Sequence, residues 1–364
     1  MLEDQKRFIK QYYMSKIIYY IGAGASYGKR RVINMGTADE ETVLAEGLPV
    51  VAEIPNRIRK FRKFIDDCAI DTSAMYEFKR MFQTRGENIV RQKQDMLQDI
   101  DELIDGIVSH ATIDTYAKKL FLIRDYRRFK TLKNVLCAYF VWEQIDHSVD
   151  QRYDTFLANV LSQNNLYLPQ SISIISWNYD SQFELAYSFY TKNGRFPVFD
   201  KNKDDEWERL PDYGCVFKVN GSATYGNFSV VNEILKDNEL PKDIQLIMFY
   251  GDSKADTSSL GFQYTPHLSF AWEQTVNQEK MMEYIRQTTQ DTISVVVIGY
   301  SFPFFNREVD REIIGNMPNL KTIYIQDPNA EAIEQSIRAV LPDDTKIKIE
   351  YRKNCEQFYL PSEL

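Results

Sequence analysis

The chain has 364 residues, of which 44% are hydrophobic and 26% charged, and its formal net charge is -8. This composition supplies a full hydrophobic core and excludes a disordered chain, while the length favours one large domain with a sizeable insertion, or two domains. The acidic balance argues against direct binding of nucleic acid, because such proteins normally present a basic face to the phosphates.

The cysteines and the N-terminal residues exclude further classes. Four isolated cysteines, Cys68, Cys137, Cys215 and Cys355, form no Cys-x-x-Cys pair, so we expect no thiolate metal site and a reducing compartment. The first residues, MLEDQKRFIKQYYMSK, are charged throughout, unlike a signal peptide. No apolar run approaches the roughly 20 residues of a membrane span. We therefore expect a cytoplasmic protein with no membrane association.

The first predicted strand covers residues 17–21 (IIYYI), a short β-branched and aromatic run, and the polar residues 27–47 after it are predicted to form a loop. From Pro49 to about Leu161 the chain shows helical spacing with few breakers. The clearest stretches are residues 75–104, 112–123 and 129–145. We therefore predict a helical insertion domain over residues 49–164.

Further strands are expected at residues 171–176, 215–219, 245–249, 293–298, 321–326 and 346–351. Helical patterns follow several of them, at residues 181–190, 306–314 and 329–340. Strands that alternate with helices and carry continuous β-branched runs predict an α/β fold, Rossmann-like, with a mostly parallel sheet and helices on both faces. Residues 1–48 and 165–364 are expected to form this domain, with an irregular stretch at 222–290.

In an open α/β sheet, ligands bind beyond the carboxyl ends of the strands, so the residues after each strand are candidates for a site. Gly22-Ala23-Gly24-Ala25-Ser26 follows the first strand, and Gly-x-Gly lets a backbone turn tightly and approach a diphosphate. Tyr27 stands where a Rossmann fingerprint needs glycine, and Gly28-Lys29 does not complete a P-loop. By itself this stretch fits a dinucleotide site and a tight structural strand exit equally well.

Asn178 and Asp180 follow the strand at 171–176, where a strand opens into a helix. Asp180 or Ser181 would serve as a helix N-cap without any further function, but Asn178 is not explained in this way. An asparagine amide offers an acceptor and two donor protons, which suits ribose hydroxyls. The strand at 215–219 is followed in turn by Asn220-Gly221-Ser222.

Two later strands also end in small or polar residues. Gly299-Tyr300-Ser301 follows the strand at 293–298, and Asp327 and Asn329 follow the strand at 321–326. Asp327 or Asn329 could reach a second ribose, or could serve as an ordinary helix N-cap. Small or polar residues thus follow five strands in chain order, which is more than strand exits require.

In this order the motifs resemble those of the sirtuin-like superfamily over residues 16–330. Gly22–Ser26 resembles the opening GAGxS loop, Trp177–Asp180 the catalytic Asn-x-Asp segment, and Gly299–Pro303 the Gly-x-Ser loop. Gly47-Leu48-Pro49 and Lys218–Ser222 resemble the Gly-[Ile/Leu]-Pro and Lys-Leu-His-Gly-Ser elements. The resemblance is closer to the bacterial anti-phage defence branch than to protein deacetylases, whose four-Cys zinc ribbon is missing here.

The resemblance implies an NAD+ glycohydrolase that releases nicotinamide and ADP-ribose as a latent effector of abortive infection. Partners implied by it are NAD+, further copies of the chain, and a defence protein such as a HerA-type ATPase or a nucleotide-sensing subunit. Asn178 would hold the nicotinamide ribose and orient water, with Asp180 in support and Asn220 bonded to the ribose. The residues implied in binding NAD+ are Gly22, Ala23, Gly24, Ala25, Ser26, Gly221, Ser222, Gly299, Ser301, and Asp327 or Asn329.

One departure from the family pattern concerns the catalytic histidine, whose position is taken by Asn220. Asparagine cannot accept a proton at neutral pH, so it cannot act as the general base. His110 could approach the site from the insertion or simply lie at the start of a helix, and His147 and His267 fall elsewhere. A catalytically degraded scaffold subunit that binds NAD+ or ADP-ribose is therefore the alternative function, with protein deacylation third.

Overall fold

We describe the structure from a computed structural model of the chain. It describes residues 16–28, 30–34, 41–45, 47–70, 89–163, 166–191, 197–202, 210–225, 230–236, 240–254, 265–275, 277–342 and 346–364. These residues divide into two compact units. The first, here called the sheet unit, comprises Met1–Leu48, Ser148–Gly221 and Ser269–Leu364, and the second, the helical unit, comprises Pro49–His147 and Ser222–Leu268.

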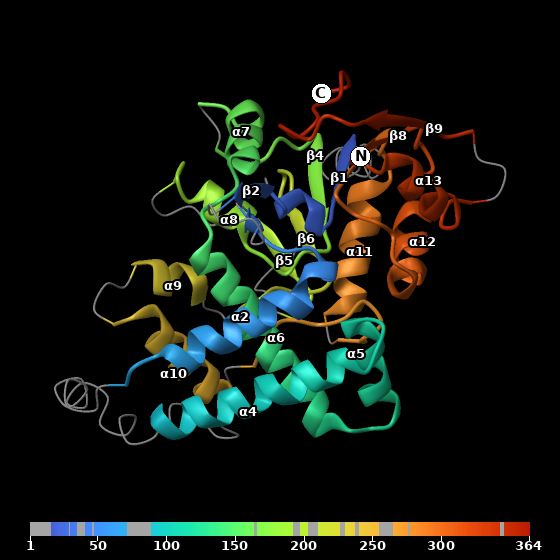
Figure 1. Cartoon of the computed structure of the whole chain (residues 1–364). Helices are drawn as coiled ribbons and strands as arrows, with labels where there is room; N and C mark the ends of the chain where they lie inside the picture. The colour runs from blue at the N-terminus through green and yellow to red at the C-terminus, as the bar shows by residue number, and fades with distance from the viewer. Residues whose placement is uncertain are drawn as a thin grey trace. The chain divides into compact units, whose positions relative to one another are not determined.

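The sheet unit is built on seven parallel strands in the order β5-β6-β4-β1-β7-β8-β9 (Figure 1). Their bounds are β1 Ile17–Ile21, β4 Ile172–Ser176, β5 Val198–Asp200, β6 Val216–Lys218, β7 Ser294–Ile298, β8 Thr322–Gln326 and β9 Lys348–Arg352. The strand β1 lies between β4 and β7, and all five of its residues are buried. This confirms the predicted Rossmann-like α/β fold, because continuous β-branched runs suit strands that are covered on both faces.

Alternate residues of β1 point to opposite faces of the sheet, and each face has its own apolar core. Ile18 and Tyr20 pack with α11 (Gln278–Thr289), α12 (Arg307–Gly315) and α13 (Ala330–Arg338). Ile17, Tyr19 and Ile21 pack with α7 (Gln151–Val160), α8 (Gln182–Tyr187) and Phe358 near the C-terminus. The short 3-10 helices η1 (Ala23–Ser26) and η3 (Phe304–Asn306) lie between strands and helices of this unit.

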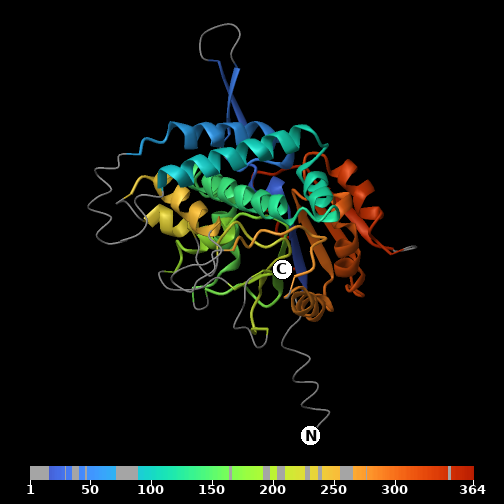
Figure 2. The ribbon, with the colours of Figure 1, turned by 90° about the horizontal axis from the view of Figure 1, so that it is seen from below.

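In the helical unit, the described elements within Pro49–His147 are all helices. They are η2 (Val51–Glu53), α2 (Ile54–Asp67), α4 (Ile89–Val108), α5 (Ile113–Leu122) and α6 (Tyr126–Asp146). The helices α2, α4 and α6 pack side by side (Figure 2), and α9 (Val230–Lys236) and α10 (Lys242–Lys254) pack on this group. The unit differs from the predicted 49–164 insertion, because 222–268 belong to it and α7 packs on the sheet.

Two sequence predictions about secondary structure are wrong. Residues 245–249 (QLIMF) form part of α10 rather than a strand, and Ile244, Ile247 and Tyr250 recur at helical spacing as its buried side chains. A short apolar run does not distinguish a buried helix from a strand. The predicted loop 27–47 contains an antiparallel pair, β2 (Arg30–Asn34) and β3 (Glu41–Ala45). Each of these strands is only five residues long and mixes charged with β-branched residues, which hides the strand pattern.

Other elements were not predicted at all. The strand β5 is only three residues long, and α9 and α11 lie in the stretch 222–290 that was predicted to be irregular. Part of the predicted helix 75–104 lies outside the described residues, which resume at Ile89 where α4 begins. The predicted helices 112–123, 129–145, 306–314 and 329–340 correspond to α5, α6, α12 and α13.

Candidate functional site

The segments that follow β1, β4 and β7 meet at one edge of the sheet. Ile21, at the end of β1, lies beside Ser176 of β4 on one side and Ile298 of β7 on the other. Within this sheet, β4 follows β1 in chain order and lies on one side of the pair formed by β1 and β7. The strand β8 follows β7 and lies on the other side, so the strand order reverses direction between β1 and β7. Such a topological switch point is the usual place of a ligand site in open α/β sheets.

Gly22 and Gly24 lie against the backbone of the segment that follows β7. A Cβ on Gly22 would stand 2.5 Å from the main-chain oxygen of Gly299, and one on Gly24 would stand 2.7 Å from the Cα of Gly299. The Gly24 amide donates to that same oxygen at 2.9 Å, and Gly299 itself has a positive φ of 59°. Close approach within the chain therefore accounts for these three glycines. Ala23 and Gly24 are the partly exposed residues of the loop.

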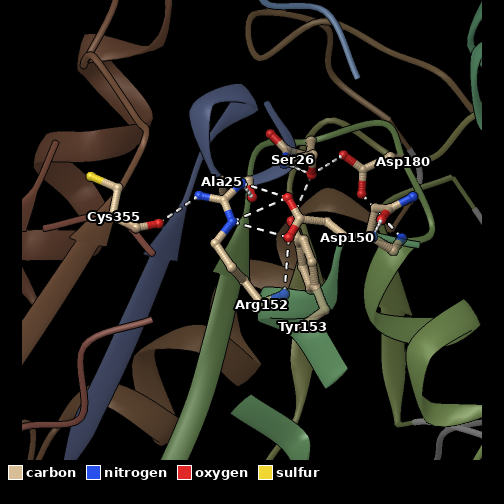
Figure 3. A network of polar contacts seen from close by, with 9 residues as sticks. Ala25, Ser26, Asp150, Arg152, Tyr153, Asp180 and Cys355 are labelled. Carbon is tan, nitrogen blue, oxygen red and sulfur yellow. Dashed lines mark hydrogen bonds and ion pairs between the residues drawn. The ribbon is translucent and has the colours of Figure 1, made fainter. Parts of the chain in front are cut away.

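The buried hydroxyl of Ser26 is the centre of a hydrogen-bonded group formed by the exits of β1 and β4 and by α7 (Figure 3). It donates to Asp180 Oδ2 at 2.8 Å and accepts from Asn178 Nδ2 at 3.3 Å. The Tyr153 hydroxyl lies 2.6 Å away. Burial, with a smaller contribution from Asp180, raises the pKa of Tyr153 well above its usual value, so this phenol remains a donor. One donated and two accepted bonds use the full capacity of the serine hydroxyl.

The Asp180 segment is held from β6 as well. The buried Lys218 ammonium donates to the main-chain oxygen of Asp180 and lies 3.4 Å from the Glu184 carboxylate in the first turn of α8. Burial raises the pKa of Glu184, against the opposing effect of Lys218. The main-chain amide of Gln182 donates to Asp180 Oδ1 at 3.1 Å, so Asp180 also stabilises the start of α8 as an N-cap residue does. Asp180 therefore accepts hydrogen bonds both from the start of α8 and from the Ser26 hydroxyl.

Asn220, after β6, lies beside the exit of β4. Its Nδ2 donates to the main-chain oxygen of Trp177 at 3.3 Å, whereas its buried Oδ1 accepts no hydrogen bond from the described residues. The Oδ1 of Asn178 likewise has no donor among the described residues. The buried Oδ1 of Asn220 without a donor costs free energy, on the order of 1–3 kcal/mol, which a bound hydroxyl or amide would offset. The positive φ of 71° at Gly221 turns the chain away directly after Asn220.

The remaining predicted residues lie around this group or outside it. Ser301 is exposed after β7, and Asp327 Oδ1 accepts from the Asn329 amide at 2.8 Å. That bond closes a local turn at the start of α13, as expected for an ordinary helix start. Ser222 is the first residue of the second stretch of the helical unit. Ser26, Asn178, Asp180 and Asn220 are thus the predicted polar residues that the structure brings together.

All three histidines belong to the helical unit, so the sheet unit has none. His110 Nδ1 lies 2.8 Å from the main-chain oxygen of Gly106, and its Nε2 lies 3.2 Å from Lys119 Nζ. The ring therefore has partners within its own helical surroundings, just before α5. In the Ser26 group, the side chains that could accept a proton are carboxylates rather than imidazoles.

Sequence reasoning missed a second polar group, which lies under the exit of β7. The fully buried Asp310 of α12 accepts from the Tyr20 hydroxyl at 2.5 Å and from the Tyr300 hydroxyl at 3.0 Å. Asn306 Nδ2 donates to the Tyr300 hydroxyl at 2.9 Å. Burial raises the pKa of Asp310 to about 7, although the two tyrosine bonds oppose this effect. In the sequence, Asp310 is visible only as one of the two acidic residues in the first turn of an amphipathic helix.

The described residues hold no cluster of three or more His, Cys, Asp or Glu side chains arranged to bind a metal ion. The four cysteines, all of which lie in the described part of the chain, form no disulfide bond. In the described part of the chain, none of the helices combines the length and the apolar character that crossing a membrane requires.

The relationship to the sirtuin-like superfamily rests on the motifs and stays a prediction. The residues that carry the resemblance, Gly22–Ser26, Asn178, Asp180 and Asn220, lie at the ends of neighbouring parallel strands. Comparisons of the whole chain with models of protein families, with curated proteins and with solved structures found no significant match.

Proposed function

We propose that the chain is an NAD+ glycohydrolase, which cleaves the bond between nicotinamide and ribose and releases ADP-ribose. The observation that carries the proposal is the pair of amide oxygens, Asn178 Oδ1 and Asn220 Oδ1, at the ends of the neighbouring strands β4 and β6. Each accepts no bond from the described residues, and both suit the hydroxyls of a ribose. The partly exposed Ala23 and Gly24 at the switch point are in the position expected for a diphosphate.

The chemistry needs little covalent help from the protein. Nicotinamide is a cationic leaving group, and its departure leaves an oxocarbenium-like ribose that water attacks. Correct placement of ribose and water supplies much of the rate in such a reaction. In the proposed site Asn178 holds the ribose and orients the water. Asp180 positions Asn178 through Ser26, since both side chains bond the same hydroxyl.

We further propose that the enzyme is a latent cytoplasmic effector of anti-phage defence. The motif resemblance supports this biological setting, as it supports a homo-oligomer and a defence partner such as a HerA-type ATPase or a nucleotide-sensing subunit. Latency follows from the chemistry, because unrestrained NAD+ hydrolysis would be toxic to the cell that makes the protein.

Nicotinamide release by the purified chain, alone and with its native partner, tests the proposal. We expect Asn178→Ala to lower the rate by about 100-fold or more, because the ribose and the water lose their positioning. Asn319→Ala is the matched control, since this exposed amide donates only to the main-chain oxygen of Gln290. Equal rates for Asn178→Ala and the wild type in folded protein would refute the assignment.

A second function, an NAD+- or ADP-ribose-binding scaffold without turnover, is favoured by the lack of histidine in the sheet unit. Calorimetry with ADP-ribose, combined with the nicotinamide-release assay, separates the two candidates. Binding that depends on Asn178 and Asn220, with no nicotinamide release in any condition, would establish the scaffold. Release that Asn178→Ala abolishes would establish the enzyme.

A further inference from the structure

The chain passes between the sheet unit and the helical unit four times, after Leu48, His147, Gly221 and Leu268. On the sheet-unit side, each passage lies within a few residues of a contact to the proposed site. The Leu48 amide donates to the main-chain oxygen of Ser26 at 2.7 Å. The Ser269 amide donates to the main-chain oxygen of Asn220 at 2.9 Å, only one residue before Gly221.

The passage after His147 makes the most extensive contacts. The Asp150 amide donates to Gln182 Oε1 at 2.9 Å, at the start of α8. Arg152 Nη2 donates to the main-chain oxygen of Ala25 at 2.8 Å, and Tyr153 reaches Ser26. The N-cap residue of α7, Asp150, and two residues of its first turn, Arg152 and Tyr153, therefore hold residues of the GAGAS loop or of the segment after β4.

The Arg152 guanidinium joins three parts of the sheet unit (Figure 3). It pairs with Asp150 through two nitrogens, at 3.0 and 2.6 Å, and donates to the main-chain oxygens of Ala25 and Cys355. Only 12% of the Arg152 side chain and 9% of the Asp150 side chain are exposed. Loss of the guanidinium would leave a buried carboxylate and the Ala25 oxygen without this donor, which is costly in a desolvated setting.

We propose that Arg152 is a positioning residue of the proposed site. It holds the carbonyl of Ala25 beside the start of α7, where Tyr153 holds the hydroxyl of Ser26. The part of this inference that concerns activity rests on the proposed function, whereas the part that concerns the GAGAS loop does not.

Hydrogen exchange of the amides of residues 22–28, measured without NAD+, tests the positioning role. In Arg152→Gln we expect these amides to exchange about tenfold faster or more, because Ala25 loses its anchor. Arg152→Lys keeps the charge but cannot reach Asp150 and both carbonyls at once, so an intermediate effect is expected. Arg286→Gln, which removes an exposed arginine paired with Glu283 and Glu312, is the control. Wild-type exchange in both Arg152 variants would overturn the inference.

Where hydrolysis is measurable, Arg152→Gln should lower kcat by a factor about ten times larger than the factor by which it raises KM. Arg152→Lys should restore part of the lost kcat.

Amide exchange and nicotinamide release also test the role of Arg152 separately from the proposed function. If the wild type releases no nicotinamide in any condition, the hydrolase proposal fails, yet the exchange measurements still decide on Arg152. If nicotinamide is released and Asn178→Ala abolishes it, but the exchange of residues 22–28 is unchanged in both Arg152 variants, the hydrolase stands and the positioning role fails.

Discussion

Asp310 lies fully buried between the hydroxyls of Tyr20 and Tyr300, and burial raises its pKa to about 7. A carboxyl with a pKa higher in the folded than in the unfolded chain binds more protons when folded. The contribution of Asp310 to the free energy of unfolding therefore falls as the pH rises from about 4 to about 7, by up to roughly 1.4 kcal/mol per pH unit.

Asp310→Asn should flatten this dependence. The asparagine keeps an oxygen that can accept from the tyrosines but cannot ionise, so the variant should lose less stability than the wild type between pH 5 and pH 7. Urea unfolding at several pH values measures the difference. The exposed Asp291→Asn serves as the control. Parallel pH dependences for Asp310→Asn and the wild type would show that Asp310 does not govern this slope.

The predictability of the site differs between its residues. Ser26, Asn178, Asp180 and Asn220 could be predicted, because each directly follows a recognisable strand. Tyr153, Arg152, Lys218 and Glu184 could not, because they reach the site only through the packing of α7, β6 and α8. No local pattern in a helix shows which distant hydroxyl or carbonyl its first turn will meet.

The exits of β1 and β7 interlock through glycine. A Cβ on Gly22 would lie 2.5 Å from both the Gly299 oxygen and the Cα of Tyr300. We expect Gly22→Ala to lower the free energy of unfolding by about 2 kcal/mol or more, because backbone on both sides must move. The change should be visible in chemical unfolding without any ligand.

Gly315, at the end of α12, provides the matched control, since a Cβ there meets nothing within 4 Å. Gly315→Ala should be neutral or stabilise the protein by up to about 1 kcal/mol, as alanine is the better helix former. A Gly22→Ala variant as stable as the wild type would show that this loop has room for a side chain. The glycines would then need another explanation, such as a bound diphosphate.

The central strands that were predicted correctly share one property. β1, β4, β7 and β8 carry continuous β-branched or aromatic runs and are buried in the middle of the sheet. The wrong prediction, residues 245–249, has an equally apolar run, but its flanks continue as a helix from Lys242 to Lys254. Burial alone makes a run apolar, so a five-residue window does not separate the two cases.

The division of the molecule into two units was only partly accessible from the sequence. A helical block after the first strand could be read from its spacing, but the grouping of 49–147 with 222–268 comes from tertiary contacts. Helix α7 is amphipathic, as α4 and α5 of the helical unit are, and nevertheless packs on the sheet. Its place matters for function, because α7 supplies Arg152 and Tyr153.

We propose that a ribose lies against Asn178 and Asn220 at the carboxyl edge of the sheet. A crystal structure of the full chain with ADP-ribose bound tests this binding mode. We predict a ribose hydroxyl within hydrogen-bond distance of Asn178 Oδ1 or Asn220 Oδ1, with the diphosphate over Ala23 and Gly24. An ADP-ribose molecule bound elsewhere, with these two amide oxygens still without a donor, would contradict the account.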